Sequence, residues 1–140
     1  MSNNKMRFGK GYEYELIGQM VQAGLDCYIP VADDDGIDVV IRKNDGSFTD
    51  VQIKAINNKD SGLFTSVVIP KNTQTFFVVF YDVRLTRRWI LTKDELVKYG
   101  SRNARGKEIG KFNINFKTKK NKTIFDEFSS RQLTFITKKD

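Results

Sequence analysis

The chain has 140 residues, of which 39% are hydrophobic, enough for one domain with a packed core and too few for two. It has no histidine and a single cysteine, Cys27, which excludes histidine-dependent triads, internal disulfides and thiolate zinc clusters. No run approaches the roughly 20 apolar residues of a membrane span, and no apolar stretch follows Met1–Lys5 as in a signal peptide, so we expect a cytoplasmic protein.

The net charge of +7 is unevenly distributed along the chain. Residues 1–70 hold 7 Lys/Arg and 10 Asp/Glu, a net of −3, whereas residues 71–140 hold 17 and 7, a net of +10. An acidic half beside a basic half favours a carboxylate site next to a surface that grips a polyanion. Surface lysine that serves solubility is the alternative interpretation.

The N-terminal part predicts a helix and a short strand. After an irregular lead over residues 1–9, apolar spacing predicts a helix over residues 10–24 that ends at Gly24. A short strand over residues 26–31 follows. Residues 33–36, Asp-Asp-Asp-Gly, then predict a tight acidic turn. Its three carboxylates could supply a second metal site, but turn formation is the simpler account.

Two further strands are predicted to form a hairpin. Residues 36–42 and 48–55 flank Asn44-Asp45-Gly46, a three-residue loop with glycine where a left-handed backbone is needed. Because side chains alternate between the two faces of a strand, one face is apolar and holds Ile37, Val39, Ile41, Val51 and Ile53.

Chemically useful side chains gather on the other face of this hairpin. With the three-residue loop as the turn, the numbers of paired residues add up to 90, so Asp38 lies opposite Gln52 and Gly36 lies opposite Lys54. A carboxylate, an amide oxygen and an ammonium group then share one sheet face, and Gly36 leaves room beside Lys54.

The second half predicts more strands and at least one helix. The strand candidates, in chain order, are residues 63–69, 75–82, 87–91 and 112–116. Residues 75–82 are the most apolar stretch and are predicted as a central strand buried on both faces. Thr92–Glu95 is a capping box that begins a helix. Residues 125–137 are predicted to form a short helix and a final edge strand.

Two carboxylates of the first helix differ in their position. Glu13 heads the apolar stripe that packs on the sheet, so it can lean over the sheet edge where Asp38 emerges. Glu15 falls on the solvent side of the same helix. The sequence therefore favours Glu13 as a partner of the hairpin residues.

The gathered side chains suit metal chemistry on a phosphate. Asp38, Gln52 and Glu13 are oxygen donors, which suit a hard cation such as Mg²⁺. Such a cation can lower the pKa of a bound water and steady charge on a phosphate. Lys54 can orient that water or neutralise a pentavalent transition state. The plainer alternative is an ordinary cross-strand Asp–Lys pair on a solvated sheet face, with Gln52 as filler.

Four short pieces in order resemble the PD-(D/E)XK nuclease superfamily, most closely its Holliday-junction-resolvase and Mrr-like branches: Gly11-x-Glu13, Gly24, Gly36-Ile37-Asp38 and Val51-Gln52-Ile53-Lys54. The resemblance covers residues 10–56. It implies one nuclease-like domain over residues 1–140 with a restriction-endonuclease-like α/β fold. In that fold a mixed central β-sheet is flanked by helices, and an N-terminal helix is followed by an antiparallel hairpin that carries the site.

The resemblance also implies a role for each site residue. Asp38 would be the principal metal ligand, and Gln52 would ligate through its amide oxygen where most members have Glu or Asp. Lys54 would be the catalytic lysine. Glu13 would complete the metal shell, and the backbone carbonyl of Ile53 would be a further ligand. The implied metal is Mg²⁺, with Mn²⁺ as a substitute. A neutral Gln52 removes one negative charge, so Mg²⁺ binding should be weaker.

The function implied is that of a metal-dependent endonuclease that hydrolyses phosphodiester bonds in DNA. One alternative is a catalytically inactive nucleic-acid-binding module on the same fold, in which Gln52 records lost chemistry. Another is an accessory subunit of a defence or mobile-element system. Intact Asp38 and Lys54 favour the enzyme. Cleavage of both strands would favour a homodimer with two-fold symmetry.

Cations of the basic half are candidates for contacts with the DNA backbone. Some lie near Trp89, some in the glycine-punctuated loop over residues 100–110, and some in the turn over residues 117–122, predicted as a hairpin tip. In chain order they are Arg84, Arg87, Arg88, Arg102, Arg105, Lys119, Lys120 and Lys122. Solvated edges and turns are the alternative interpretation for each of them.

Overall fold

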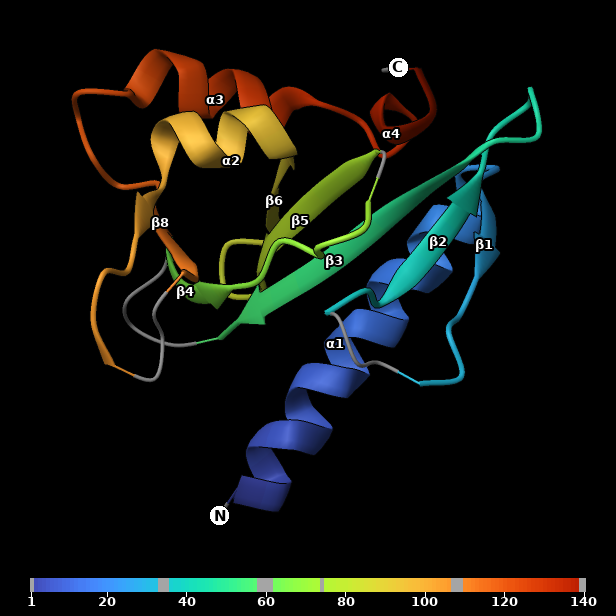
Figure 1. Ribbon diagram of the computed structural model, residues 1–140, viewed down its shortest axis with the longest axis horizontal. Coiled ribbons are helices and arrows are strands. Elements are labelled where there is room, and N and C mark those ends of the chain that lie inside the picture. Colours follow the sequence, from blue (N-terminus) through green and yellow to red (C-terminus); the bar gives the residue numbers. More distant parts are fainter. Residues whose placement is uncertain (1, 33–35, 58–61, 74, 107–109, 139–140) are drawn as a thin grey trace.

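The computed structural model describes every residue except 1, 33–35, 58–61, 74, 107–109 and 139–140. Its elements, in chain order and as labelled in Figure 1, are α1 (Ser2–Gln22), β1 (Asp26–Tyr28), β2 (Val39–Arg42), β3 (Phe48–Ile56), β4 (Leu63–Val67), β5 (Phe76–Asp82), β6 (Arg87–Thr92), α2 (Lys93–Tyr99), β7 (Ser101–Arg102), β8 (Phe112–Asn115), α3 (Lys122–Ser130) and α4 (Phe135–Lys138).

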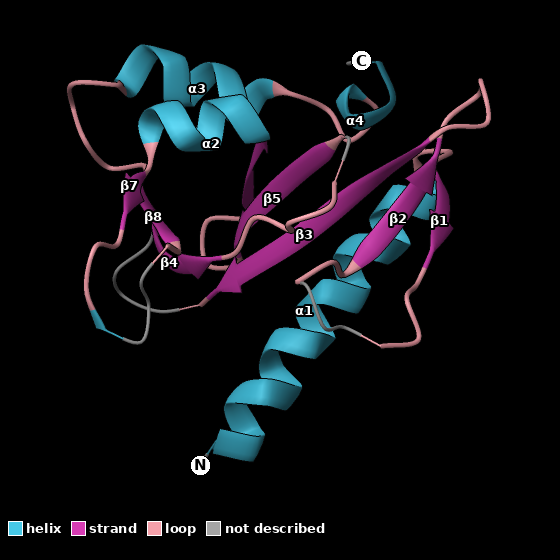
Figure 2. Cartoon of the chain, in the orientation of Figure 1, coloured by secondary structure: helices cyan, strands magenta, loops and turns pink. Residues whose placement is uncertain are grey.

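The strands form two sheets, seen in Figure 2. The larger sheet has five strands in the order β1-β2-β3-β5-β6, and the smaller has three in the order β4-β8-β7. Within the larger sheet β3 and β5 are parallel, and the other neighbours are antiparallel. The predicted fold class, a mixed central sheet flanked by helices with an N-terminal helix and an antiparallel hairpin, is confirmed.

Each face of the five-stranded sheet carries its own hydrophobic core. The first core contains Leu16 and Met20 of α1 and Ile136 of α4. The second core, on the opposite face, contains side chains of α2, α3 and the three-stranded sheet, such as Leu96 and Phe125. The interior strand β5, between β3 and β6, contributes to both cores, and all seven of its residues are buried. The prediction of a strand buried on both faces is therefore confirmed.

The first helix is longer than predicted, so the prediction of an irregular lead over residues 1–9 is wrong. The helix begins at Ser2, and the rings of Phe8 and Tyr12, one turn apart, meet with centroids 4.5 Å apart. It ends where predicted: Gly24 has a φ of +91°, and the N–H of Leu25 donates to the carbonyl of Met20 at 3.0 Å. This left-handed glycine cap closes the last turn.

The strand predicted over residues 63–69 forms as β4, in the segment between β3 and β5. It pairs with the distant strand β8, and Phe64 lies opposite Ile114. The side chains of both residues are buried in the second core. Long-range burial therefore decides the pairing.

The predicted final edge strand is also wrong, because residues 135–138 form α4. The N–H groups of Phe135, Ile136 and Thr137 each donate to a carbonyl three residues earlier. Leu133 and Ile136, also three residues apart, are both buried in the first core. Leu133 lies in the turn that leads into α4, and the three-residue spacing brings its side chain and that of Ile136 to the same side.

A candidate active site at the end of the hairpin

The hairpin of β2 and β3 has the predicted register. Val39 lies opposite Val51 and Ile41 opposite Thr49, so paired residue numbers add up to 90. The loop closes through the N–H of Lys43, which donates to the carbonyl of Ser47 at 2.7 Å. Gly46 has a φ of +88°, the left-handed backbone that the three-residue loop requires.

This register sends alternate side chains to opposite faces of the sheet. Val39, Ile41, Val51 and Ile53 are buried in the first core, as predicted. Gln52 and Lys54 therefore project from the other face. Asp38 precedes β2, and its N–H donates to the carbonyl of Val51 at 2.9 Å, which keeps it beside β3.

Glu13, Asp38, Gln52 and Lys54 line one open hollow of about 410 Å³, here called the Asp38 hollow. Three of them come from the hairpin. Glu13 comes from α1, whose N-terminal half extends beyond the sheet in Figure 1. The structure thus brings together the four side chains that the sequence singled out.

Asp38 is held in place by the backbone of the neighbouring strand. The N–H of Ile53 donates to Oδ2 of Asp38 at 2.7 Å. A hydrogen bond to a carboxylate is stronger than one between neutral groups. It therefore fixes the carboxylate between the positions from which Gln52 and Lys54 project.

Gln52 is buried, with 4% of its surface exposed. Its amide oxygen, Oε1, accepts no hydrogen bond from any residue that the structure describes. Leaving a buried acceptor unsatisfied costs about 1–3 kcal/mol. A cation bound between this oxygen and the Asp38 carboxylate, which lines the same hollow, would offset that free-energy cost.

Gly36 makes room for Gln52, not for Lys54 as predicted. A Cβ built on Gly36 would lie 2.7 Å from Nε2 of Gln52, and Gly36 has a φ of +78°. The described ladder between β2 and β3 begins at Val39. Because the chain has left the ladder before that residue, the pairing of Gly36 with Lys54 does not occur.

The two acids of α1 are separated as expected. Glu13 lines the Asp38 hollow and pairs with Lys10, its carboxylate oxygen 3.2 Å from the ammonium nitrogen. Glu15 is exposed and interacts with Tyr81, whose pKa is raised by burial and by the nearby Glu15 carboxylate. Helix periodicity is thus the signal that distinguishes the two residues.

The donor set of the Asp38 hollow fits a magnesium-type cation. Among the described residues there is no group of three or more His, Cys, Asp or Glu side chains that could hold a metal. Mg²⁺, however, commonly uses one or two carboxylates and keeps several waters. Asp38 and Glu13 offer two carboxylates, and the unsatisfied oxygen of Gln52 offers a third, neutral ligand.

Two polar residues that line the hollow, Ser66 and Lys111, were not predicted from the sequence. Ser66 lies within the bulged part of β4, has a φ of +60° and donates its N–H to Oδ1 of Asn113. Lys111 directly precedes β8. The basic character of residues 100–111 was a signal for Lys111, but only the β4–β8 pairing brings that segment to the hairpin.

The predicted DNA-contact residues lie in several places. Arg88 donates to Oε1 of Gln19 on α1, at 2.8 Å. Arg87 and Lys122 both bind Asp126, at 2.9 and 2.7 Å. The remaining five are exposed: Arg84, Arg102, Arg105, Lys119 and Lys120. Residues 117–121 lead into α3, so their prediction as a hairpin tip is wrong. Asp33, Asp34 and Asp35 lie outside the described residues.

The sheet topology, the leading helix and the hairpin define a mixed α/β fold. A solved structure of a bacterial homing endonuclease, I-Ssp6803I, is similar over 88% of this chain and 94% of that chain, with a TM-score of 0.52 and 16% sequence identity. At that identity the likeness concerns the fold. No protein-family model and no curated protein sequence matches the chain. Within the described residues, no helix has the length and apolar character needed to cross a bilayer.

Proposed function

We propose that the protein is a metal-dependent endonuclease of the PD-(D/E)XK type that hydrolyses phosphodiester bonds in DNA. The observation that carries the proposal is the Asp38 hollow, where two carboxylates, an unsatisfied buried amide oxygen and a lysine converge. The likeness in fold to a bacterial homing endonuclease supports it. The net charge of +10 over residues 71–140 supports a polyanionic substrate.

The proposed cofactor is Mg²⁺, for which Mn²⁺ would substitute. Asp38, Glu13 and the amide oxygen of Gln52 would hold it, with the backbone carbonyl of Ile53 as a further ligand. When bound, the ion would lower the pKa of a coordinated water and stabilise negative charge on the phosphate.

The residues themselves would orient the reacting groups. The N–H of Ile53 holds the Asp38 carboxylate in one position, which fixes the ligand geometry. Lys54 would donate a hydrogen bond to the attacking water or to a phosphate oxygen, where negative charge grows in the transition state. Water oxygen would bond to phosphorus while the phosphorus–oxygen bond to the leaving group breaks, and the leaving oxygen takes up a proton.

Cleavage assays on plasmid and branched DNA with Mg²⁺ or Mn²⁺ test this proposal. Asp38→Ala and Lys54→Ala are each expected to lower the rate by about 10²-fold or more, while DNA binding persists. The variants Glu13→Gln and Glu15→Gln form a matched pair. Both acids lie on α1, but of the two, Glu13 lines the hollow. Only Glu13→Gln should slow cleavage. Wild-type rates in Asp38→Ala would place the chemistry elsewhere.

A catalytically inactive DNA-binding module is the second candidate, favoured by the neutral side chain of Gln52 at the metal site. Gln52→Glu distinguishes the two. In a working enzyme it should tighten Mg²⁺ binding, measured by calorimetry, and preserve cleavage. If the wild type binds DNA without cutting it, and Gln52→Glu restores cutting, the inactive module is the correct interpretation.

A further inference from the structure

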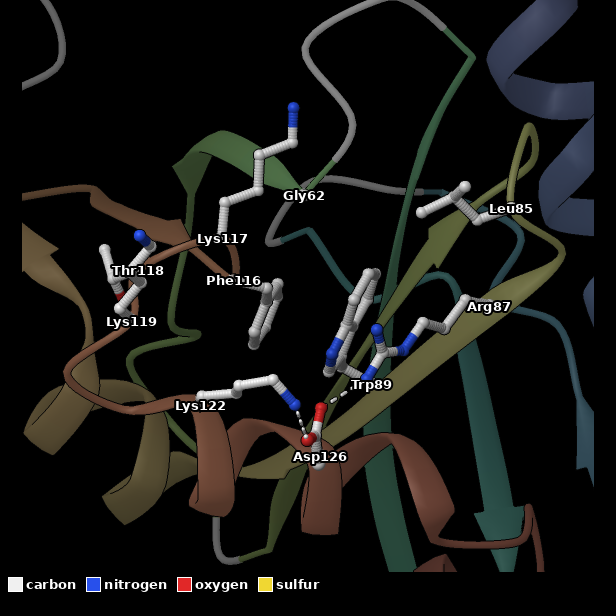
Figure 3. A pocket seen from close by; sticks show the side chains of 10 residues that line it. All are labelled: Gly62, Leu85, Arg87, Trp89, Phe116, Lys117, Thr118, Lys119, Lys122 and Asp126. Atoms are coloured by element: carbon white, nitrogen blue, oxygen red, sulfur yellow. Dashed lines mark hydrogen bonds and ion pairs between the residues drawn. The ribbon is translucent and has the colours of Figure 1, made fainter.

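A second hollow of about 520 Å³ opens beside the N-terminal turn of α3 (Figure 3). Here it is called the aromatic–basic pocket, defined by Arg87, Trp89, Phe116, Lys117, Lys119 and Lys122. Its volume lies within the range of about 300–1,000 Å³ typical of small-ligand sites. None of the four side chains proposed to hold the metal or act on the phosphate lines it.

The apolar part of this pocket consists of exposed Leu85 and the edges of two stacked core rings, Trp89 and Phe116, which are 2% and 8% exposed. The rings of Trp89 and Phe116 lie face to face in Figure 3, with centroids 4.4 Å apart and an interplanar angle of 3°. Most of the pocket wall is apolar. The indole N–H of Trp89 is buried and donates to no acceptor among the described residues. The apolar wall therefore favours a ligand with an apolar part.

The polar part of the pocket is cationic. Asp126 is the acid among its lining residues, and it binds Lys122 at 2.7 Å and Arg87 at 2.9 Å. The hydrogen bond from Lys122, and to a smaller extent that from Arg87, holds the pKa of the Asp126 carboxyl below its ordinary value. The carboxylate is therefore ionised, and the two cations balance its negative charge. Lys117 and Lys119 then add positive charge beyond that balance. The pocket therefore favours an anion.

The aromatic–basic pocket and the Asp38 hollow are lined by residues that lie in one row across neighbouring strands of the five-stranded sheet. Lys54 lies opposite Phe80, and Phe80 lies opposite Trp89. Two strand spacings separate Lys54 from Trp89, about 10 Å. Phe64 lies against Phe80, Trp89 and Phe116, so aromatic side chains form the wall between the two hollows. At about 3.4 Å per nucleotide, that separation corresponds to about three nucleotides of one DNA strand.

We propose that the aromatic–basic pocket binds one unpaired nucleotide of the DNA. Paired bases are stacked inside a duplex, which presents mainly phosphates to a protein, whereas an unpaired nucleotide presents an apolar base as well as a phosphate. The two rings cover each other's facing sides, and the Arg87 guanidinium lies 4.9 Å from the centroid of the Trp89 ring. The base would therefore lie against Leu85 and the ring edges, and the phosphate against Lys117 and Lys119. The inference rests on the proposed function for its DNA partner, and it narrows the substrate to DNA with a single-stranded segment.

Intrinsic fluorescence tests the proposal, because Trp89 is the only tryptophan of the chain. The wild-type protein is titrated in EDTA, where no cleavage takes place, with a short oligothymidylate, an abasic oligonucleotide of equal charge and a blunt duplex of equal phosphate content. We expect a saturable change with oligothymidylate, at least about fivefold tighter than with either control. An unchanged emission, or equal affinity for the abasic strand, overturns the proposal.

Lys119→Ala and Lys120→Ala form the matched pair of variants. Both lysines are exposed neighbours in one turn and lose the same charge, but of the two, Lys119 lines the pocket. We expect Lys119→Ala to weaken oligothymidylate binding at least about threefold more than Lys120→Ala. Equal effects would mean a general charge contribution and overturn the site. Nuclease activity measured separately on plasmid DNA would survive that failure, so the two proposals fail independently.

Discussion

Gln52 keeps an unsatisfied amide oxygen in the interior, beside a carboxylate held by a backbone N–H. Native proteins satisfy most of their buried polar groups, so an exception in a hollow indicates a function that would satisfy it. The neutral side chain brings no charge to the site, which leaves Asp38 and Glu13 as the two carboxylates that line the hollow. At the residue scale, the position of the Gln52 side chain therefore depends on close packing by its neighbours.

Replacement of Gly36 tests this dependence. Gly36→Ala would add a Cβ 2.7 Å from Nε2 of Gln52, at a φ of +78°. We expect a stability loss of about 1–2 kcal/mol from the strained backbone, measured by urea denaturation. Because Gln52 must also shift, cleavage and Mg²⁺ affinity should fall at least about tenfold.

Gly46→Ala is the control for backbone strain. Gly46 has a similar φ of +88°, but a Cβ there meets nothing within 4 Å. It should lose comparable stability and keep its cleavage rate and Mg²⁺ affinity. If both variants lose activity equally, the fit between Gly36 and Gln52 has no part in the site.

At the scale of elements, Glu95 joins the start of α2 to the end of α3. Its carboxylate accepts from the N–H of Thr92 at 2.9 Å, which completes the predicted capping box. It also accepts two hydrogen bonds from Arg131, at 2.6 and 2.7 Å. Arg131 in turn donates to the carbonyl of Ile90 in β6. These helices cover the second core, beside the aromatic–basic pocket.

The pKa of Glu95 predicts a pH-dependent part of the stability. Burial raises this pKa, but the hydrogen bonds from Arg131 and Thr92 outweigh it, so the net shift is below the ordinary value of 4.5. A carboxyl whose pKa is lower in the folded state stabilises the fold above its unfolded pKa, and the contribution is lost as the pH falls through the folded pKa.

Glu95→Gln should therefore destabilise the protein by about 1–2 kcal/mol at pH 7. The difference from the wild type should shrink as the pH falls below 4.5. Urea midpoints measured across this range provide the test. Asp94→Asn removes an exposed acid of the same helical turn and should change stability little. A difference that stays constant with pH would contradict the role given to the Glu95 carboxylate.

On the scale of the whole molecule, charge separates the chain into an acidic half that carries the proposed metal ligands and a basic half that would hold the DNA backbone. DNA affinity should therefore fall steeply with salt, because lysine and arginine release condensed counterions from phosphate. Fluorescence anisotropy of labelled duplex across a salt series measures this slope. An affinity that ignores ionic strength would contradict polyanion binding.

Neutralising Lys119 and Lys120 together should flatten that slope by about 1–2, since each lost phosphate contact removes about 0.9. Arg42 and Lys71 are two exposed cations outside both hollows. Neutralising that control pair should leave the slope nearly unchanged. If both pairs flatten the slope equally, Lys119 and Lys120 contribute no more to DNA binding than other exposed cations do.

Local rules were sufficient for the hairpin, the central strand and the capping box. The loop at Gly46 sets the register between β2 and β3, and alternation of side chains then gathers Gln52 and Lys54 on the face opposite Val51. Periodicity alone chose Glu13 over Glu15. Each of these predictions depends on residues close together in sequence, whose geometry is the same in any fold that contains the element.

Only the tertiary structure decided what surrounds the hairpin. The pairing of β4 with β8 brings Ser66 and Lys111 to the Asp38 hollow, and α3 brings Lys122 to Trp89. Strand propensity and side-chain alternation allow an apolar strand such as β4 to pair equally well with several other strands. The choice among them depends on which arrangement buries the most side chains across segments far apart in sequence, and local spacing carries no record of it.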